Sequence, residues 1–396
     1  MTKTSILIPD GESTFANLVV HCLSFDRDVE IHVLSKDPNA SIKYSRFIST
    51  FQTYDTSLIG EVPLPNNRKI SGVMEELIRL HHYDATKSGP LTAEIIRHAE
   101  KRKAQIVFPV DEHIVKIIAS RKAEINRVAL LAPLPDLETY TRAIDKWQLA
   151  DFLKSTDIPH PRTVKYAKGV SEKVIAELPF PAIIKPVDQG NGQGIYTFQD
   201  PTELLLFFEN QEIQHEYIVQ PFITGFDIDC SCLCSEGRIL SYTIQKGILS
   251  STKKFQAAVG IEFLYDERVL RVVERLMKHL NWSGVAHIDL RYDQKANEIK
   301  VIEINARYWG SLLGSLHAGI NFPLLAIKTA KGEVFEKEEY RFTRYFMGKS
   351  PLQKLWKTAF GPRKERVRLN DTSLFYQLRD PVPVIFEMIK RFKAFL

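Results

Sequence analysis

The segment VAHIDLRY, residues 285–292, and the segment IKVIEIN, residues 299–305, decide the fold of this chain. Successive side chains of a strand point to opposite faces, so Asp289 and Glu303 fall on a polar face while apolar residues fall on a core face. Residues 293–298 between the segments are rich in turn formers, which predicts an antiparallel hairpin. A turn centred on the middle of that stretch places Asp289 opposite Glu303.

Two facing carboxylates indicate a cation site in this hairpin. Like charges about 5 Å apart cost roughly 3 kcal/mol at an effective dielectric near ~20, and a divalent cation between them reverses that sign. Asn305 shares the polar face with Glu303, and the three residues offer the hard oxygen ligands that suit Mg²⁺ better than Zn²⁺ or copper. An ordinary hairpin with a charged exposed face is the alternative. On the other face, Ile302 and Ile304 are expected in the core.

Length and composition predict two or three domains in a reducing compartment. The chain has 396 residues, more than one ordinary core holds, and 44% of them are hydrophobic. It shows neither a signal peptide nor an apolar run of membrane-spanning length, so we expect a cytoplasmic protein. Cys230, Cys232 and Cys234 alternate in a strand-like segment and are predicted to be buried side chains rather than zinc ligands.

The net charge of +5 is unevenly distributed along the chain. Residues 341–396 contain 13 Lys and Arg but only 4 Asp and Glu, so the preceding residues carry a small net negative charge. A basic tail on an acidic body does not support a nucleic-acid footprint on the main body.

Residues 1–135 are predicted to form a doubly wound parallel sheet. Short apolar runs alternate there with helical patterns, at residues 5–9, 29–34, 105–109 and 128–131. Such sheets bind ligands at the carboxyl ends of their strands, so the loops at residues 10–12 and 111–113 are candidate site loops. The G-x-G-x-x-G fingerprint is absent, which disfavours a dehydrogenase and favours a scaffold or substrate-side role.

Two lysines and a glycine-rich loop predict contacts with phosphate groups. Lys146 opens a helix whose Asp-x-x-Gln start resembles a capping box, and helix starts favour anions. Lys185 lies in an apolar strand, where a lysine normally needs an anionic partner. The glycines that follow allow the backbone to approach a polyanion closely: Gly190, Gly192 and Gly194. Solvated lysines and a plain hairpin loop are the alternatives.

The strand at residues 217–223 leads through a turn into a second strand at residues 226–234. Backbone groups beside Phe222 and Ile223 can hydrogen-bond an adenine edge, and Asp227 can accept from ribose hydroxyls. Two core strands joined by a turn are the simpler explanation of the same residues.

Taken in order, these residues resemble the ATP-grasp superfamily of carboxylate–amine ligases. The resemblance covers about residues 136–330, and the segment EINARYWGS, residues 303–311, is similar to members related to carbamoyl-phosphate synthase and biotin carboxylase. It implies an α/β fold in which a doubly wound pre-ATP-grasp domain, residues 1–135, precedes an α+β ATP-grasp domain of two subdomains. A basic C-terminal extension, residues 331–396, would follow.

The resemblance also implies roles for individual residues. The implied nucleotide contacts are Lys146, Lys185, Gly190, Gly192, Gly194, Gln220, Phe222, Ile223 and Asp227. The implied ligands of Mg²⁺, or alternatively Mn²⁺, are Asp289, Glu303 and Asn305. Lys185 and Arg307 are the implied catalytic residues, with Arg307 on phosphate or on the substrate carboxylate. Gln220 and Asp227 stand where many members have Glu, and His287 stands where D-alanine ligase-like members have Arg, so no substrate is assigned.

The predicted function is that of an ATP-dependent, ADP-forming ligase. Such an enzyme activates a small carboxylate as an acylphosphate and couples it to an amine. The alternative is a regulatory or scaffold protein that binds ATP without turnover, because fold alone does not establish activity. The lysine pair together with the oxygen ligands favours the enzyme.

The C-terminal residues predict an amphipathic helix with a contact role. Its apolar residues fall at helical spacing, at Ile385, Met388, Ile389, Phe392, Phe395 and Leu396. With the basic residues nearby, this helix can dock on an anionic membrane surface. Packing on the enzyme body or on the partner in a homodimer is the favoured alternative.

Overall fold

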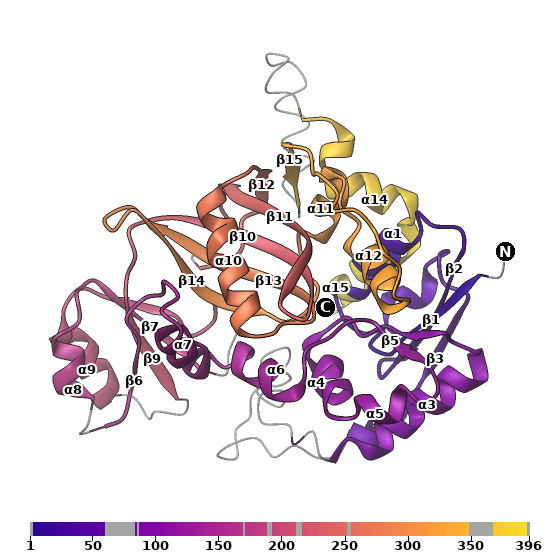
Figure 1. The fold of residues 1–396 in the computed structure, drawn as a ribbon, viewed down its shortest axis with the longest axis horizontal. Helices are drawn as coiled ribbons and strands as arrows, with labels where there is room; N and C mark the ends of the chain where they lie inside the picture. The colour runs from indigo at the N-terminus through magenta and orange to yellow at the C-terminus, as the bar shows by residue number, and fades with distance from the viewer. Residues whose placement is uncertain are drawn as a thin grey trace.

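A computed structural model describes residues 3–59, 84, 87–168, 171–187, 192–210, 216–251, 255–347 and 367–393. The described strands form three sheets that follow one another along the chain (Figure 1). The predicted doubly wound N-terminal sheet and the predicted α+β region after it are both present. The domain boundaries at residues 135 and 330 stay predictions.

The first sheet is parallel, with strand order β3-β2-β1-β4-β5. Its strands are β1 (Thr4–Ile8), β2 (Val29–Ser35), β3 (Thr50–Thr53), β4 (Ile106–Val107) and β5 (Leu130–Leu131). Ile6 and Ile8 pack with α1 on one face, whereas Leu7 packs with α3 and α4 on the other. The helices of this region are α1 (Ala16–Leu23), η1 (Ser41–Tyr44), η2 (Thr56–Ile59), α3 (Gly89–Arg102), α4 (Glu112–Ser120) and α5 (Lys122–Ile125).

The strand β3 escaped prediction because it contains no apolar run. It is an edge strand of the sequence TFQT, and its side chains are half-buried or exposed. Edge strands bury only one side, so their hydrophobic signal is weak.

The second sheet is small and antiparallel, with strand order β6-β9-β7-β8. Two helices, α6 (Leu137–Ile144) and α7 (Lys146–Ser155), precede it. Its elements are β6 (Val164–Lys165), α8 (Glu172–Ala176), β7 (Ala182–Pro186), β8 (Tyr196–Phe198), α9 (Pro201–Asn210) and β9 (Tyr217–Pro221). Helices α8 and α9 cover one face through a core of its own that includes Ile184, Leu204 and Phe208.

The third sheet is the largest, with strand order β14-β13-β10-β11-β12-β15. Its strands are β10 (Gly225–Ser235), β11 (Arg238–Leu249), β12 (Gly260–Phe263), β13 (Gly284–Asp293), β14 (Glu298–Asn305) and β15 (Arg344–Phe346). Its helices are α10 (Glu267–His279), α11 (Leu312–Ala318) and α12 (Phe322–Ala330). Cys230, Cys232 and Cys234 are free and fully buried beneath α10, which confirms their prediction as core residues.

The predicted hairpin of β13 and β14 is confirmed, with one correction. Asp289 pairs with Glu303, but the register shifts between Asp289 and Leu290, where Val301 becomes the next partner. Ile302 is therefore the extra residue of a bulge and is only half-buried, whereas Val301 is 1% exposed and takes the core position. A bulge breaks the alternation of side chains, which the prediction for Ile302 assumed throughout.

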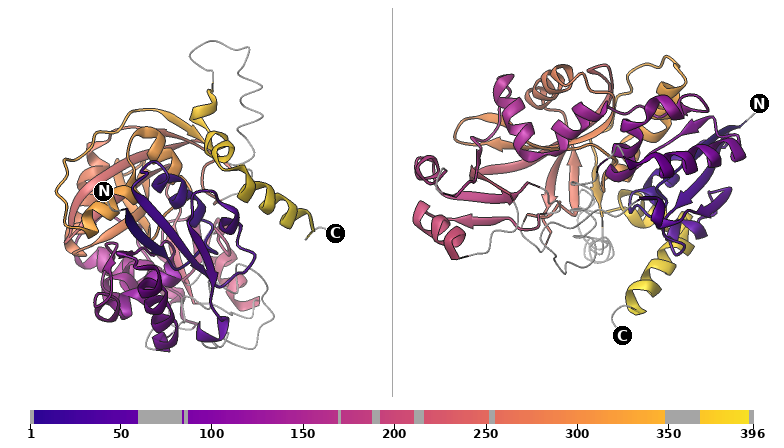
Figure 2. Two further views of the ribbon diagram at one scale, coloured as in Figure 1. Left: turned by 90° about the vertical axis from the view of Figure 1, so that its right-hand side faces the viewer. Right: turned by 90° about the horizontal axis from the view of Figure 1, so that it is seen from below.

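The C-terminal elements return to the first sheet. They are η6 (Leu369–Asp371), α14 (Ser373–Arg379) and α15 (Pro381–Lys393), and α15 projects from the body with one side against η1 (Figure 2). The Ser45 hydroxyl donates to Asp380 at 2.5 Å, and the rings of Tyr44 and Phe386 lie 4.5 Å apart. On another side of α15, Ile385 is 53% exposed. The helix therefore packs partly on the body, and packing on the body was one of the predicted alternatives.

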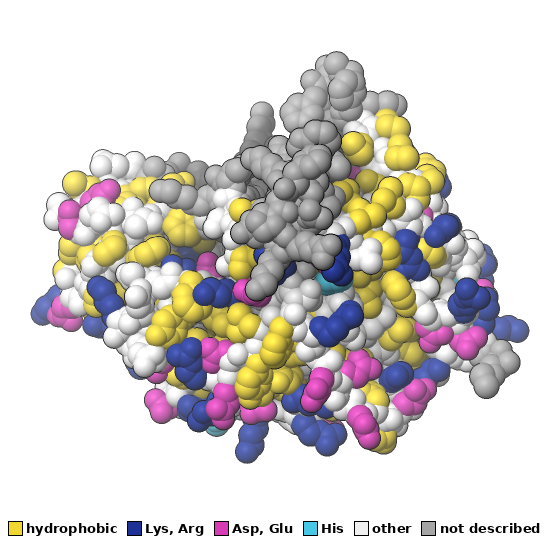
Figure 3. Space-filling model, turned by 90° about the horizontal axis from the view of Figure 1, so that it is seen from above, with side chains coloured by type: hydrophobic (Ala, Val, Ile, Leu, Met, Phe, Trp, Pro, Cys, Tyr) yellow, Lys and Arg dark blue, Asp and Glu magenta, His cyan; other side chains and the backbone are white. Residues whose placement is uncertain are grey.

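No described helix is both long and apolar enough to cross a membrane. On the face of the molecule seen in Figure 3, acidic and basic side chains are interspersed.

Candidate active site

Acidic side chains from three neighbouring strands lie on one face of the large sheet. Glu303 of β14 pairs in register with Asp289 of β13, which in turn pairs with Asp229 of β10. Asn305 follows Glu303 by two residues on β14, and its Nδ2 lies 3.4 Å from the Asp289 carboxylate. The predicted oxygen ligands are thus brought together, and Asp229 joins them without having been predicted.

The pKa values of these acidic side chains reflect their burial and their mutual repulsion. Burial, reinforced by Glu303 and Asp229, raises the pKa of Asp289 well above its ordinary value. Burial also raises the pKa of Asp229, to about 7. Burial acts on Glu303 in the same direction, but Lys146, Lys185 and further contacts outweigh it, so the pKa of Glu303 is lowered. The face therefore attracts cations.

The two predicted lysines approach the acids from other elements. Lys146 is the first residue of α7, which Asp145 caps by accepting from the Trp147 amide at 2.9 Å. The Lys146 ammonium lies 3.9 Å from Glu303. Lys185 of β7 is 7% exposed, and burial lowers its pKa while Glu303 partly offsets that shift. Both cations thus face the acidic strands from outside the large sheet.

The predicted adenine-binding segment follows the end of β9. Gln220 is 4% exposed, and its amide donates to Thr163 at 2.9 Å, while its Oε1 has no hydrogen-bond partner among the described residues. Phe222 and Ile223 come directly after the strand, and the Phe222 amide donates to the Pro181 carbonyl at 2.8 Å. A buried acceptor that lacks a partner is costly, so this position fits a donor from a ligand.

Arg291 of β13 contacts the predicted adenine-binding segment, although no role was predicted for this arginine. Its guanidinium donates to the Ile223 carbonyl at 2.8 Å, pairs with Asp227 and lies over the Phe222 ring at 5.4 Å. Asp227 itself is 72% exposed. The alternation on β13 did put Arg291 on the polar face, but its partner could not be found without the pairing of β10 with β13, which sets it opposite Asp227.

Two of the three predicted loop glycines are described, and Gly190 lies outside the described residues. Gly192 has φ +71° and Gly194 has φ +66°, in the left-handed region that favours glycine. A Cβ at position 192 would lie 2.2 Å from the Phe255 carbonyl oxygen. The loop therefore lies in close backbone contact with the segment that leads into β12.

Arg307 joins the large sheet to the first domain. Its Nε lies 3.1 Å from the Glu112 carboxylate and 3.7 Å from that of Asp111, and its Nη2 donates to Asn305 Oδ1 at 3.1 Å. Asp10 accepts from the Asp111 amide at 2.6 Å, which holds the two predicted loops of the first sheet together. One of these loops thus reaches the predicted catalytic arginine, a contact between distant segments that no local pattern indicated.

Comparison with known proteins identifies the class of the fold. Residues 143–311 match the protein-family model described as an ATP-grasp domain. These residues therefore form an ATP-grasp domain, and the superfamily indicated by the sequence is confirmed.

Relatives of the chain include an amino-acid ligase. The D-aspartate ligase of Enterococcus faecium (strain Aus0004) is 22% identical over 282 residues, an alignment that covers 66% of this chain and 66% of that ligase. The chain thus spans just under two thirds of the length of this relative.

Solved structures extend the likeness over most of the chain. N5-carboxyaminoimidazole synthetase from Staphylococcus aureus, complexed with ADP, matches with a TM-score of 0.64 at 13% identity and covers 91% of this chain and 86% of that one. The biotin carboxylase domain of 2-oxoglutarate carboxylase from Hydrogenobacter thermophilus, complexed with MgADP, ADP and bicarbonate, matches with a TM-score of 0.62 at 15% identity, covering 87% and 73%. These likenesses confirm the predicted fold class.

Proposed function

We propose that the protein is an ATP-dependent, ADP-forming carbon–nitrogen ligase that activates a carboxylate as an acylphosphate and couples it to an amine. The observation that carries this proposal is that Lys146 and Lys185 both interact with Glu303 on the acidic face of the large sheet. Lysines opposite carboxylates form a site where phosphate groups and divalent cations neutralise one another. The D-aspartate ligase among the relatives supports the reaction class.

The oxygen ligands fit Mg²⁺. Asp289 and Glu303 face each other in register, and burial together with like-charge crowding raises the pKa of Asp289, which a bound cation would offset. Asn305 can add a neutral oxygen once its amide turns, because its Oδ1 accepts from Arg307 and its Nδ2 faces Asp289. Bound there, Mg²⁺ would shield the phosphate charges during transfer. Mn²⁺ is an alternative ion for the same three ligands.

We assign the nucleotide to residues of the small sheet and the adjoining strands of the large sheet. The buried Gln220 Oε1 can accept a hydrogen bond from an adenine amino group, and the backbone at Phe222 and Ile223 lies beside it. Asp227 can accept from ribose hydroxyls while Arg291 holds it in place. We assign Gly190, Gly192 and Gly194 to the loop that covers the phosphates, since glycine backbone approaches a polyanion closely.

The lysines and Arg307 supply the charge stabilisation that this reaction needs. The bound carboxylate attacks the γ-phosphorus of ATP, the bond to the β-phosphate oxygen breaks, and ADP leaves. Lys185 and Lys146 neutralise the oxygens of the transferred group, and Arg307 orients the acyl group. The amine then attacks the acyl carbon, phosphate leaves, and the ammonium proton passes to solvent. Because the γ-phosphoryl group is the group transferred, the nucleotide product is ADP.

A screen of amino acids and other small carboxylates, each paired with a set of amines, tests this proposal. We expect ADP release that requires both a carboxylate and an amine. A protein that binds ATP as a regulator or scaffold would bind nucleotide in calorimetry without such release. Tight ATP binding with no dependence of ADP release on any pair would reject the ligase in favour of that alternative.

We also infer that the exposed side of α15 packs on a second copy of the chain. Val382, Ile385 and Ile389 lie at helical spacing and are each at least half exposed. Removal of residues 381–396 should then shift the chain from dimer to monomer in analytical ultracentrifugation. The alternative is an anionic membrane surface, which predicts instead that only the full chain floats with acidic liposomes.

A further inference from the structure

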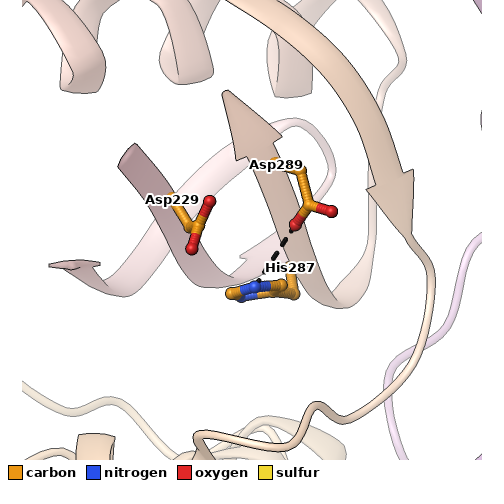
Figure 4. Close-up of side chains that lie close together, drawn as sticks. All are labelled: Asp229, His287 and Asp289. Atoms are coloured by element: carbon orange, nitrogen blue, oxygen red, sulfur yellow. Dashed lines mark ion pairs between the residues drawn. The ribbon is translucent and has the colours of Figure 1, made fainter. Parts of the chain in front are cut away.

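Three potential metal ligands, one of them also a predicted magnesium ligand, converge on the polar face of the large sheet. Asp229 of β10 and Asp289 of β13 are register partners, and His287 precedes Asp289 by two residues on the same face of β13. One donor atom from each residue lies within 4.8 Å of the others. Figure 4 shows both carboxylates and the imidazole around a common space, with the His287 Nε2 at 3.3 Å from Asp289.

The imidazole is held in the orientation that metal ligation needs. The His287 Nδ1 lies 2.8 Å from the hydroxyl of Ser231, which is fully buried. The His287 ring also stacks on Trp309, with ring centres 5.6 Å apart and an angle of 14° between the planes. A ligating histidine usually hydrogen-bonds through its second nitrogen in this way. The Nε2 is thereby directed at the carboxylates.

The Asp229 carboxylate is held by a second chain of contacts. Gln245 of β11 is 3% exposed, and its amide donates to Asp229 at 3.3 Å. Ser311 in turn donates to the Gln245 carbonyl oxygen at 2.9 Å, which fixes the direction of the amide. Both aspartate and histidine therefore have buried supporting partners, unlike an incidental group of charges on an exposed face.

The donor set differs from that of a magnesium site. Imidazole suits transition-metal ions, whereas Mg²⁺ prefers oxygen ligands alone. Two ligands that each lie about 2.0–2.2 Å from one ion are about 3.0–3.6 Å apart, which matches the spacing of His287 and Asp289. The more distant donors in the group need only small side-chain rotations to reach the same ion.

We propose that Asp229, His287 and Asp289 bind a divalent transition-metal ion in the absence of nucleotide. The site shares Asp289 with the magnesium ligands of the proposed ligase but does not involve Glu303 or Asn305. Because all three ligands come from the protein, binding does not depend on catalysis. The ion fixes Asp289 in place and adds positive charge beside the position proposed for the phosphates.

The test titrates the full chain, stripped with a chelator and free of nucleotide, with Mn²⁺ as the probe. Free Mn²⁺ is followed by electron paramagnetic resonance. With about a 100-fold excess of Mg²⁺ present to compete for the oxygen ligands of the proposed ligase site, we expect one Mn²⁺ to stay bound per chain, because the imidazole discriminates between the ions. His287→Gln and Asp229→Asn should each weaken binding by at least about 10-fold.

Two control variants separate this site from its neighbours. Asp227→Asn changes an exposed carboxylate on the same strand as Asp229, and Glu303→Gln removes a magnesium ligand of the proposed ligase; both should keep the Mn²⁺ site. Circular dichroism confirms that each variant is folded.

Displacement of Mn²⁺ from the wild type by that excess of Mg²⁺ would overturn the proposal, as would unchanged binding in folded His287→Gln and Asp229→Asn. The wild-type competition gives this answer even when a variant does not fold. Since no substrate is present, a failed ligase screen leaves the result intact, and the two failures are distinguishable.

Discussion

The molecule contains two groups of carboxylates, and the positively charged partners of the two groups differ. Asp289 and Glu303 lie on strands of the large sheet, and their cations, Lys146 and Lys185, come from α7 and the small sheet. Asp111 and Glu112 lie where the loop after β4 enters α4, and both pair with Arg307. Burial raises the pKa of Asp289 in the first group and of Glu112 in the second, but Glu112 pairs with an arginine at 3.1 Å, whereas Asp289 is crowded by Glu303 and Asp229.

This difference separates a binding group from a supporting one. The acids of the large sheet are crowded until ligands neutralise them, which is the arrangement of a site poised for charge. The loop acids hold Arg307, which in turn holds Asn305 at the end of β14. We therefore expect changes in the sheet group to act mainly on turnover, and changes in the loop group to act mainly on stability.

Glu303→Gln should have the largest effect. The substitution removes an anionic ligand with little change of shape, so turnover should fall by about 100-fold or more while folding is retained. ADP release and the thermal unfolding midpoint measure the two quantities. Glu298→Gln, an exposed position on the same strand, is the control and should leave both unchanged. If Glu303→Gln and Glu298→Gln lost the same activity, the acids of the large sheet would have no special role in turnover.

Lys185→Met should come next, because it removes a buried cation that faces the acids. We expect ATP binding and turnover to fall together, by about 10- to 100-fold, since the lysine acts on the phosphates in both states. Calorimetry with ATP and a steady-state assay give the two numbers. Lys165→Met, whose ammonium pairs with exposed Glu216, serves as the control. Undiminished ATP affinity in Lys185→Met would contradict the assigned role.

Glu112→Gln tests the loop group. It removes one carboxylate from a partly buried pair with Arg307, so the free energy of unfolding should fall by about 1–2 kcal/mol. Turnover should fall by less than about 10-fold, because Asp111 still holds the arginine. Denaturant unfolding and ADP release measure both. Glu138→Gln breaks a pair in which that glutamate is 82% exposed, and should cost much less. If Glu112→Gln lost as much turnover as Glu303→Gln, the two groups of carboxylates would not differ in function.

Gly192→Ala should give the smallest effect, confined to the loop that we propose covers the phosphates. Both Gly192 and Gly332 have φ near +70°, but only at position 192 would a Cβ meet another backbone. Left-handed strain costs each alanine variant about 1–2 kcal/mol locally. Gly192→Ala should in addition raise the KM for ATP a few-fold, whereas Gly332→Ala should not. The same KM in both variants would show that the contact with Phe255 has no part in nucleotide binding.

Local patterns predicted most of the fold and the residue types of the site. Alternation in β13 and β14 placed Asp289 opposite Glu303, and the apolar runs located four of the five strands of the first sheet. The prediction failed for Ile302, because a bulge depends on the pairing of two strands and leaves no mark in one of them.

The site contacts that escaped prediction share a physical reason. Asp229, Arg291 and Glu112 acquire their partners through contacts between distant segments, such as Arg291 with the Ile223 carbonyl. Period and composition report which face a residue occupies, but not what lies across from that face. The pairing of β10 with β13 supplies this information for Asp229 and Arg291, and the docking of the first sheet supplies it for Glu112.

Trapping of the activated acyl group tests the central claim most directly. Hydroxylamine can replace the unknown amine and convert an acylphosphate to a hydroxamate, so the assay needs only the correct carboxylate, ATP and Mg²⁺. The wild type should form hydroxamate and ADP in equal amounts, and Glu303→Gln should form almost none. Release of AMP, or hydroxamate formation undiminished in Glu303→Gln, would contradict the mechanism.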